Sequence, residues 1–167
     1  MTKSRGFGKR KGSAFERQIC KSLSLWVTNG KRSDCFWRSA MSGGRATVAF
    51  KNTNEILRVA GDICATAPEG FELCERYYFE LKHYRNIGLE SFFLYNKGPI
   101  AGWWKETKRQ AAKYSREPVL IAKGNNIPIL IVTQRILSFN PYPVAHLSNC
   151  SIGLFNRTMR TKYHVGD

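Results

Sequence analysis

Apolar residues recur at two different periods along this chain, and the periods predict which segments are helical and which are extended. A helical period follows the N-terminal segment and is carried by Phe15, Ile19, Leu23 and Trp26. Ser13 suits the N-cap of this helix, and Glu16 three residues later completes a capping box. We therefore expect a helix from about residue 13 to the Asn-Gly pair at 29–30, which suits a C-terminal cap.

Extended segments and turn signals alternate in the next part of the chain. We expect a short strand at 35–38 and two longer strands at 58–66 and 77–84, the last two separated by the turn sequence Pro-Glu-Gly at 68–70. Residues 39–56 have few periodic apolar positions and are expected to form a mobile loop. Side chains alternate along a strand. One face of the 77–84 strand therefore carries Tyr78, Glu80, Lys82 and Tyr84, and the other carries Tyr77, Phe79, Leu81 and His83.

The central part of the chain returns to helical spacing and then to strands. The expected helices span 89–95 and 100–115, and the expected strands span 118–123 and 127–133. Gly-Asn-Asn at 124–126 joins these two strands as a hairpin-type connection. Trp103 and Trp104 are adjacent on the second helix, so we expect one of them to be buried and the other exposed. The order of elements predicts a single α/β domain with a central mixed β-sheet flanked by helices.

The charge of the chain is unusual for a globular protein. Its 167 residues are 43% hydrophobic, yet Lys and Arg number 27 against 12 Asp and Glu, for a formal net charge of +15. Such an excess favours a polyanionic partner, and the phosphate backbone of a nucleic acid is the usual one. An anionic membrane surface is the weaker alternative, because no segment predicts a helix with separate apolar and basic faces.

The first ten residues are expected to form a flexible basic arm in front of a domain that spans 11–167. The basic run extends to residue 12 with three glycines, no acid and no apolar periodicity. The basic side chains nearest the domain are Lys9, Arg10 and Lys11. They either contact DNA phosphates or belong to a solvated tail, and the sequence does not distinguish these alternatives.

The cysteines and the apolar runs indicate where the protein works. The five cysteines are an odd number without a Cys-x-x-Cys pair, which argues against a zinc site. The N-terminus lacks the apolar stretch of a secretory signal, and the longest apolar runs, such as 127–132, are too short to cross a bilayer. We expect a cytoplasmic protein with reduced thiols and no membrane segment.

Asp62, Glu80 and Lys82 are the strongest candidates for a reaction centre. Glu80 and Lys82 are two residues apart on a strand and share a face. Asp62 lies in an otherwise apolar segment at 61–65, where an acid needs a cation or hydrogen bonds. Hydrolysis of a phosphodiester requires a divalent metal, a deprotonated water and stabilisation of negative charge. Two carboxylates and a backbone carbonyl suit Mg²⁺, and an ammonium group can position the water.

These residues resemble the PD-(D/E)xK nuclease superfamily. Gly-Asp-Ile at 61–63 is similar to its first half-motif, and Glu-Leu-Lys at 80–82 is similar to its second. The opening of the first helix at 11–17, and Arg38 followed by Ser-Gly-Gly at 42–44, resemble archaeal-type Holliday junction resolvases. Similar proteins are common in phage genomes. The resemblance covers roughly residues 10–133, in matching order.

The resemblance implies a restriction-endonuclease-like fold and a role for each matched residue. Asp62 and Glu80 would bind Mg²⁺, or Mn²⁺ in its place, with the Leu81 carbonyl as a further ligand. Lys82 would act on the attacking water, and Glu16 would be an accessory acid at the metal site. The residues near the scissile phosphate would be Arg17, Arg38 and Ser42. The protein would work in a bacterial cell or a phage-infected host.

The chain also departs from the pattern of the superfamily. Gly61 stands where a proline is frequent, the loop at 44–61 is longer than in the compact archaeal enzymes, and the chain beyond Thr133 has no counterpart. Ordinary structural roles remain open for two of the matched residues. A capping box accounts fully for Glu16, and Arg17 could be a solvated helix residue.

The leading interpretation is a Mg²⁺-dependent endonuclease that cuts branched DNA as a homodimer. A four-way junction has two-fold symmetry and paired cuts need two active sites, so a symmetric dimer is the natural assembly. A restriction-type or nicking endonuclease on duplex DNA is the second enzymatic alternative. A nucleic-acid-binding module without cleavage is the non-enzymatic alternative, against which the intact set of Asp62, Glu80 and Lys82 argues.

Overall fold

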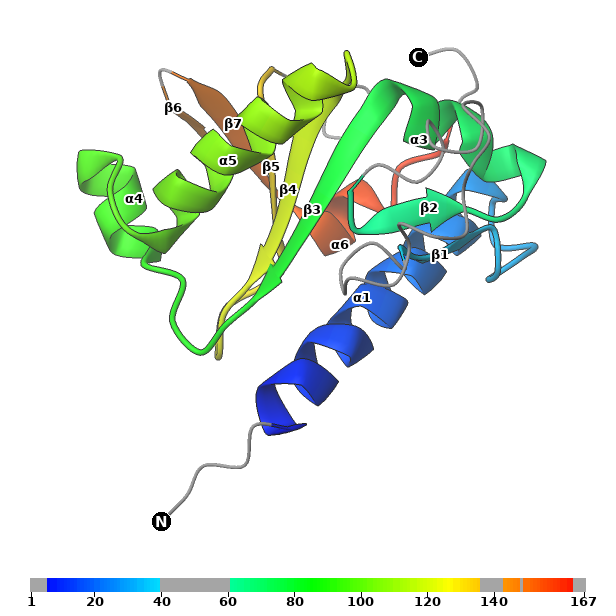
Figure 1. The fold of residues 1–167 in the computed structure, drawn as a ribbon, viewed down its shortest axis with the longest axis horizontal. Coiled ribbons are helices and arrows are strands. Elements are labelled where there is room, and N and C mark those ends of the chain that lie inside the picture. The colour runs from blue at the N-terminus through cyan, green and yellow to red at the C-terminus, as the bar shows by residue number, and fades with distance from the viewer. Residues whose placement is uncertain (1–5, 40–60, 136–142, 148, 164–167) are drawn as a thin grey trace.

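The main β-sheet of the protein has five strands and ends in β3 at one edge (Figure 1). The structure, a computed structural model, describes residues 6–39, 61–135, 143–147 and 149–163, with side chains from residue 11 onward. The strand order is β3-β4-β5-β7-β6, in which β3 and β4 are parallel and the other pairs are antiparallel. The strands span Tyr77–His83 (β3), Glu117–Lys123 (β4), Leu130–Thr133 (β5), Ala145–Leu147 (β6) and Cys150–Leu154 (β7). The expected mixed sheet is confirmed.

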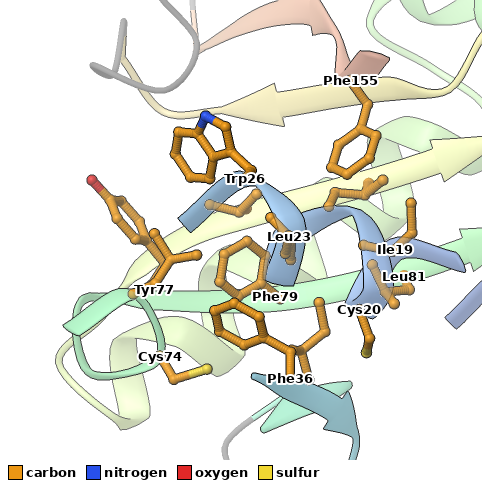
Figure 2. Packing of buried hydrophobic residues seen from close by; sticks show 14 of the residues in the cluster. Ile19, Cys20, Leu23, Trp26, Phe36, Cys74, Tyr77, Phe79, Leu81 and Phe155 are labelled. Atoms are coloured by element: carbon orange, nitrogen blue, oxygen red, sulfur yellow. The ribbon is translucent and has the colours of Figure 1, made fainter. Parts of the chain in front are cut away.

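Helices cover both faces of this sheet. One face carries α1 (Gly6–Val27) and α6 (Phe155–Thr158), and the other carries α4 (Leu89–Tyr95) and α5 (Pro99–Lys113). Figure 2 shows the α1 face, where apolar side chains of the helix meet those of β3. The residues at this contact are Ile19, Leu23, Phe79 and Leu81. The apolar face of α1, set by its helical period, therefore packs against the apolar face of β3, set by its alternation, in one core.

A second, two-stranded sheet lies beside β3. It pairs β1 (Phe36–Arg38) with β2 (Ile63–Ala65) in antiparallel register. Gly61, just before β2, makes a parallel bridge with Phe79 of β3, so the small sheet reaches the edge of the large one. The expected strand at 58–66 is thus shorter within the described residues, since β2 begins at Ile63.

The connection from β2 to β3 is helical. It contains the 3₁₀ helix η3 (Pro68–Gly70) and the α-helix α3 (Phe71–Arg76) where the sequence predicted only a turn. Six residues cover fewer than two helical turns, which is too few to show a periodic pattern.

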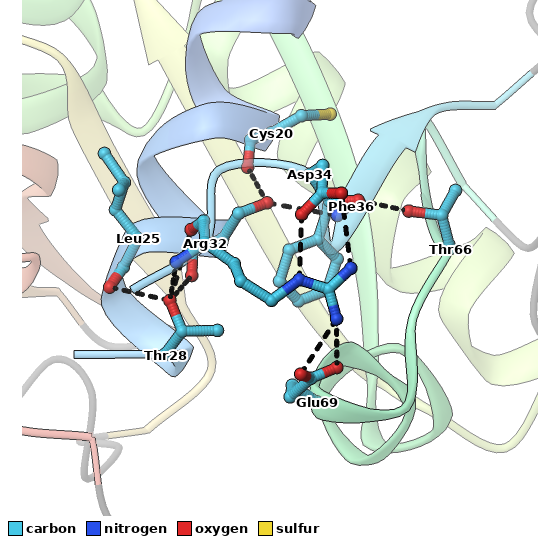
Figure 3. Close-up of polar contacts among 9 residues, drawn as sticks. Cys20, Leu25, Thr28, Arg32, Asp34, Phe36, Thr66 and Glu69 are labelled. Carbon is cyan, nitrogen blue, oxygen red and sulfur yellow. Dashed lines mark hydrogen bonds and ion pairs between the residues drawn. The ribbon is translucent and has the colours of Figure 1, made fainter. Parts of the chain in front are cut away.

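Hydrogen bonds attach β1 to α1 and to η3 (Figure 3). The buried Ser24 hydroxyl donates to the Cys20 carbonyl at 2.8 Å and accepts from the Phe36 amide at 3.1 Å. The Arg32 guanidinium bridges Asp34 and Glu69, at 3.0 Å to a carboxylate oxygen of each. The Arg32 pairs are exposed and contribute little to stability. The buried Ser24 and the hydrogen bonds from Thr66 to the Asp34 and Cys35 carbonyls therefore fix the start of β1.

The first helix begins earlier than the sequence predicted. It starts at Gly6, so Ser13 is not its N-cap, and residues 6–12 form its first turns rather than an irregular arm. The Ser13 hydroxyl instead accepts a hydrogen bond from Arg38 Nη1 at 2.8 Å. A capping box is a local pattern. Here the serine that would have formed it is hydrogen-bonded to a residue far away in the sequence. Residues 1–5 lie outside the described residues.

The remaining elements follow the sequence closely up to Thr133. The helix expected at 89–95 is α4, the one expected at 100–115 is α5, and β4 and β5 form the expected antiparallel hairpin. Beyond Thr133 the chain adds β6, β7 and α6, which the sequence did not predict, and β7 pairs with β5. All but Ser39 of the loop at 39–56 lies outside the described residues. Within the described part of the chain, no helix is long and apolar enough to span a membrane.

Candidate active site

Asp62, Glu80 and Lys82 come together at the outer edge of β3. The Asp62 amide donates to the Phe79 carbonyl at 2.8 Å, and its carboxylate oxygen Oδ2 accepts from the Leu81 amide at 2.7 Å. The backbone of Asp62 therefore makes one hydrogen bond to β3 through its amide. The Asp62 carboxylate accepts the next hydrogen bond along that strand, where a neighbouring strand would offer a carbonyl. On the same strand the Lys82 ammonium donates to Glu80 Oε1 in a close ion pair.

A glycine at position 61 is required by this geometry. Its φ angle is +94°, in the region that L-residues rarely adopt. A Cβ at this position would lie 2.5 Å from the Phe79 carbonyl oxygen, which is closer than real contacts allow. Proline, whose ring fixes φ near −65°, does not fit here. The departure from the superfamily pattern at Gly61 thus has a physical reason.

The carboxyl group of Asp62 is held in a state that disfavours its charge. Burial is the largest cause and the negative charge of Glu80 is the next, and together they raise the pKa of Asp62 to about 7. The Leu81 amide and the charge of Lys82 act in the opposite direction, while Glu16 adds a smaller repulsion. Asp62 therefore lies among acids whose charges raise its pKa even though Lys82 pairs with Glu80.

The ammonium group of Lys82 is stabilised in its charged form. Burial alone would lower its pKa, but the hydrogen bond and charge of Glu80, with smaller contributions from Asp62 and Tyr84, raise the pKa overall. The Lys82 side chain is 26% exposed and that of Glu80 is 18% exposed. The pair is accessible to a substrate, and Lys82 carries its positive charge at neutral pH.

The donor set at this edge fits a hard divalent cation. A residue in a strand directs its amide and its carbonyl to the same side, and the Leu81 amide points outward to Asp62. The Leu81 carbonyl therefore faces the same edge as the two carboxylates. No group of three or more His, Cys, Asp or Glu side chains suited to a metal occurs in the described part of the chain. Two carboxylates and a carbonyl, completed by water, suit Mg²⁺. The charges of Asp62 and Glu80 repel each other, and a divalent cation between them would relieve that repulsion.

Glu16 and Arg38 lie next to this edge. Arg38 Nε is 3.0 Å from Glu16 Oε2 in an ion pair, without the alignment of a hydrogen bond. The residue after Arg38 donates its amide to the Asp62 carbonyl at 2.8 Å. The structure thus brings Glu16 and Arg38 to the site, from α1 and β1 respectively. Glu16 has a tertiary partner there instead of completing a capping box.

Other candidates from the sequence are not brought to this site. Arg17 is exposed on α1 and has no contact with the acids. Lys11 donates to Asn125 Oδ1 at 3.0 Å, which places it at the turn between β4 and β5. Lys9 and Arg10 belong to α1, but their side chains lie outside the described residues, as does the whole of Ser42.

Aromatic side chains to which the sequence analysis assigned no function border the site. Tyr78 stacks on Tyr114 of α5, with ring centroids 5.9 Å apart. Tyr84 contacts Trp103 of α5, with centroids 4.9 Å apart. The alternation of β3 could have indicated them, because it places Tyr78 and Tyr84 on the Glu80 face. Their partners on α5 required the tertiary structure. The expectation for the Trp pair holds in part: Trp104 is fully buried and Trp103 is partly exposed.

Comparison with known proteins identifies the family. No curated protein matches the chain, and no solved structure matches it. A family model matches residues 8–158, which include both strands of the small sheet, all of the large one and every residue of the site described above. The chain belongs to this family, described as "Phage putative PDDEXK endonuclease", and thus to the PD-(D/E)xK nuclease superfamily.

Proposed function

We propose that the protein is a Mg²⁺-dependent endonuclease that hydrolyses phosphodiester bonds in branched DNA. The observation that carries the proposal is the arrangement at the β3 edge, where Asp62 binds the Leu81 amide beside the Glu80–Lys82 ion pair. Nuclease chemistry is the expected activity of the family. The residue roles, the metal and the branched substrate are the content of the proposal.

Asp62 and Glu80 would hold the metal ion, with the Leu81 carbonyl as the backbone ligand. When bound, Mg²⁺ supplies Lewis-acid polarisation of the scissile phosphate and lowers the pKa of a coordinated water. Mn²⁺ takes the same oxygen ligands and substitutes for it. The raised pKa of Asp62 makes metal binding depend on pH, because the carboxyl group must lose its proton to bind a cation.

Lys82 orients the attacking water and stabilises the charge that develops on the phosphate. Its ammonium is already fixed by Glu80, so little reorganisation is needed during the reaction. Glu16 lies on the α1 side of the site and accepts a hydrogen bond from the water. Arg38, which pairs with Glu16, turns toward the scissile phosphate when DNA is present.

The excess of basic residues binds the DNA backbone. A net charge of +15 favours a polyanion, and each neutralised phosphate releases counterions. The proposed contacts with this backbone are Lys9, Arg10, Lys11 and Arg17 on α1, together with Ser42. Branched DNA is proposed from the similarity of the 11–17 segment and of Arg38 to junction resolvases. A homodimer would supply the two active sites that paired cuts in a junction require, in the cytoplasm of a bacterial or phage-infected cell.

The experiment compares three DNAs of matched sequence: a four-way junction, a splayed arm and a linear duplex. Each is labelled and incubated with the protein in Mg²⁺, in Mn²⁺ or in EDTA. We expect cleavage of the junction in both metals and none in EDTA. Asp62→Asn and Glu80→Gln should abolish cleavage while DNA affinity stays equal or rises, because each removes a negative charge near the phosphate. Glu90→Gln, at an exposed acid of α4, is the matched control and should cleave normally.

The other outcomes separate the alternatives. Equal or faster cleavage of the linear duplex would replace the branched substrate by a restriction-type or nicking activity. Binding without cleavage of any DNA in either metal would indicate a nucleic-acid-binding module. Cleavage that persists in EDTA would refute the metal mechanism.

A further inference from the structure

An exposed aromatic pair lies at one end of the candidate active site. Tyr84 directly follows β3 and continues the face that carries Glu80 and Lys82. Its ring is 4.9 Å from that of Trp103 on α5, at an angle of 30° between the planes. Tyr84 is 53% exposed and Trp103 is partly exposed, so the pair is accessible to solvent.

Both rings are held in place by the fold. The Tyr84 amide donates to the Lys123 carbonyl at 3.0 Å, which fixes the backbone of Tyr84 to the end of β4. Trp103 packs with part of its ring against the apolar core between α5 and the sheet. A flat surface that is already ordered loses little conformational freedom when another flat group stacks on it.

The position of the pair distinguishes it from the other exposed aromatic residues of the chain. Single exposed apolar side chains are common and need no explanation, and Trp37 is of this kind, whereas Phe93, Leu94 and Tyr95 are exposed together on α4. Along an extended strand, each residue advances the chain by about 3.3 Å. Tyr84 therefore lies about 7 Å beyond Lys82 and about 13 Å beyond Glu80. A DNA strand whose phosphate is at the reaction centre would have a neighbouring nucleotide within reach of the pair.

We propose that Tyr84 and Trp103 form a stacking platform for an unpaired nucleobase of the DNA substrate. The inference rests on the proposed function, since it assumes that a phosphate of that DNA lies at Asp62 and Glu80. Bases stack on aromatic side chains with little dependence on sequence, because every base offers a flat face. A base inside a continuous duplex is covered by its neighbours. The platform therefore selects DNA with an unpaired nucleotide close to the cut, and discriminates against an intact duplex.

The test measures binding in EDTA, where no cleavage occurs. Two DNAs of matched sequence are compared, one a continuous duplex and the other with a single unpaired 2-aminopurine. Wild-type protein should bind the DNA with the unpaired base about tenfold more tightly and quench its fluorescence. Tyr84→Ala and Trp103→Ala should each remove this preference and the quenching without changing affinity for the duplex. Tyr84→Phe, which keeps the ring, and Tyr95→Ala on α4 should behave as wild type.

Each outcome decides the question. Equal binding of both DNAs by the wild type would overturn the proposal, as would quenching that persists in Tyr84→Ala. If Trp103→Ala does not fold, Tyr84→Ala is sufficient, because the Tyr84 side chain is largely outside the core. Parallel cleavage assays in Mg²⁺ separate this inference from the enzymatic one. Quenching that depends on Tyr84 in a protein that cleaves no DNA would support the platform and refute the nuclease. Cleavage without such quenching would do the reverse.

Discussion

Replacing Asp62 by asparagine should stabilise the metal-free protein at high pH. In the folded state burial and the charge of Glu80 raise the pKa of Asp62 from its ordinary 3.8 to about 7. The folded state therefore holds a proton that the unfolded chain releases, and its stability falls as the pH rises through this interval. Asparagine is nearly isosteric, remains neutral, and can still accept the hydrogen bond from the Leu81 amide.

The size of the effect follows from the shift in pKa. Ionising a carboxyl group whose pKa is raised this far destabilises the folded state by at most about 4 kcal/mol. Movement of Lys82 and entry of water reduce that figure, so we expect Asp62→Asn to gain at least about 1 kcal/mol at pH 8.5. For a protein of this size, that gain raises the Tm by roughly 2–4 °C. At pH 4.5 the wild-type carboxyl group is protonated in the folded state, so most of the difference should vanish.

Thermal unfolding of both proteins at pH 4.5 and 8.5 in EDTA measures this. Mg²⁺ at pH 8.5 should then raise the Tm of the wild type more than that of Asp62→Asn, because only the wild type offers the full ligand set. Asp34→Asn is the matched control, since hydrogen bonding to Arg32 lowers the pKa of Asp34 and its replacement should not stabilise the protein at pH 8.5. An Asp62→Asn variant that is equally or less stable than the wild type at pH 8.5 would refute the reasoning.

Three further predictions concern rate, backbone and charge. Lys82→Ala should lower the single-turnover rate roughly a hundredfold with little loss of DNA affinity, and Lys82→Arg should not restore it; an unchanged rate in quenched-flow assays would remove Lys82 from the mechanism. Gly61→Ala should destabilise the protein by about 2 kcal/mol or more in urea unfolding, because its Cβ would collide with the Phe79 carbonyl. Gly102→Ala, in a helix with open space around it, should instead be neutral or stabilising by up to about 1 kcal/mol. DNA affinity should fall steeply with salt, by about 0.9 in the log–log slope for each phosphate contacted, and a flat titration would contradict the assigned role of the +15 charge.

Local sequence patterns were sufficient for much of the fold and for the shared face of Glu80 and Lys82 at the candidate site. The alternation of β3 placed Glu80 and Lys82 on one face, and their ion pair bears this out. The hairpin of β4 and β5 and both helices before it were also evident, because each pattern depends only on neighbours in the chain. The pairing of Asp62 with β3, by contrast, amounts to one bridge and two hydrogen bonds rather than a full strand, and only the structure shows it.

Contacts between distant segments decided the rest. Helix α1 begins before the predicted capping box. The two side chains of that box, Ser13 and Glu16, instead bind Arg38 of β1 through a hydrogen bond and an ion pair. The short helix α3 and the strands β6 and β7 have too few residues, or too weak a period, to be recognised locally. Strand β7 exists as a strand because β5 offers it an edge with unpaired backbone groups.

The sequence by itself determined which residue types the site could contain, and the tertiary structure determined how they are arranged. Residue identity and spacing are enough to select two acids and a lysine, since metal binding depends on the chemistry of the ligands. The need for Gly61, the ion pair of Glu16 with Arg38, and the pairing of Tyr84 with Trp103 each depend on a backbone or side chain far away in the chain. No local period encodes such contacts, because they arise only when separate elements meet around a common core.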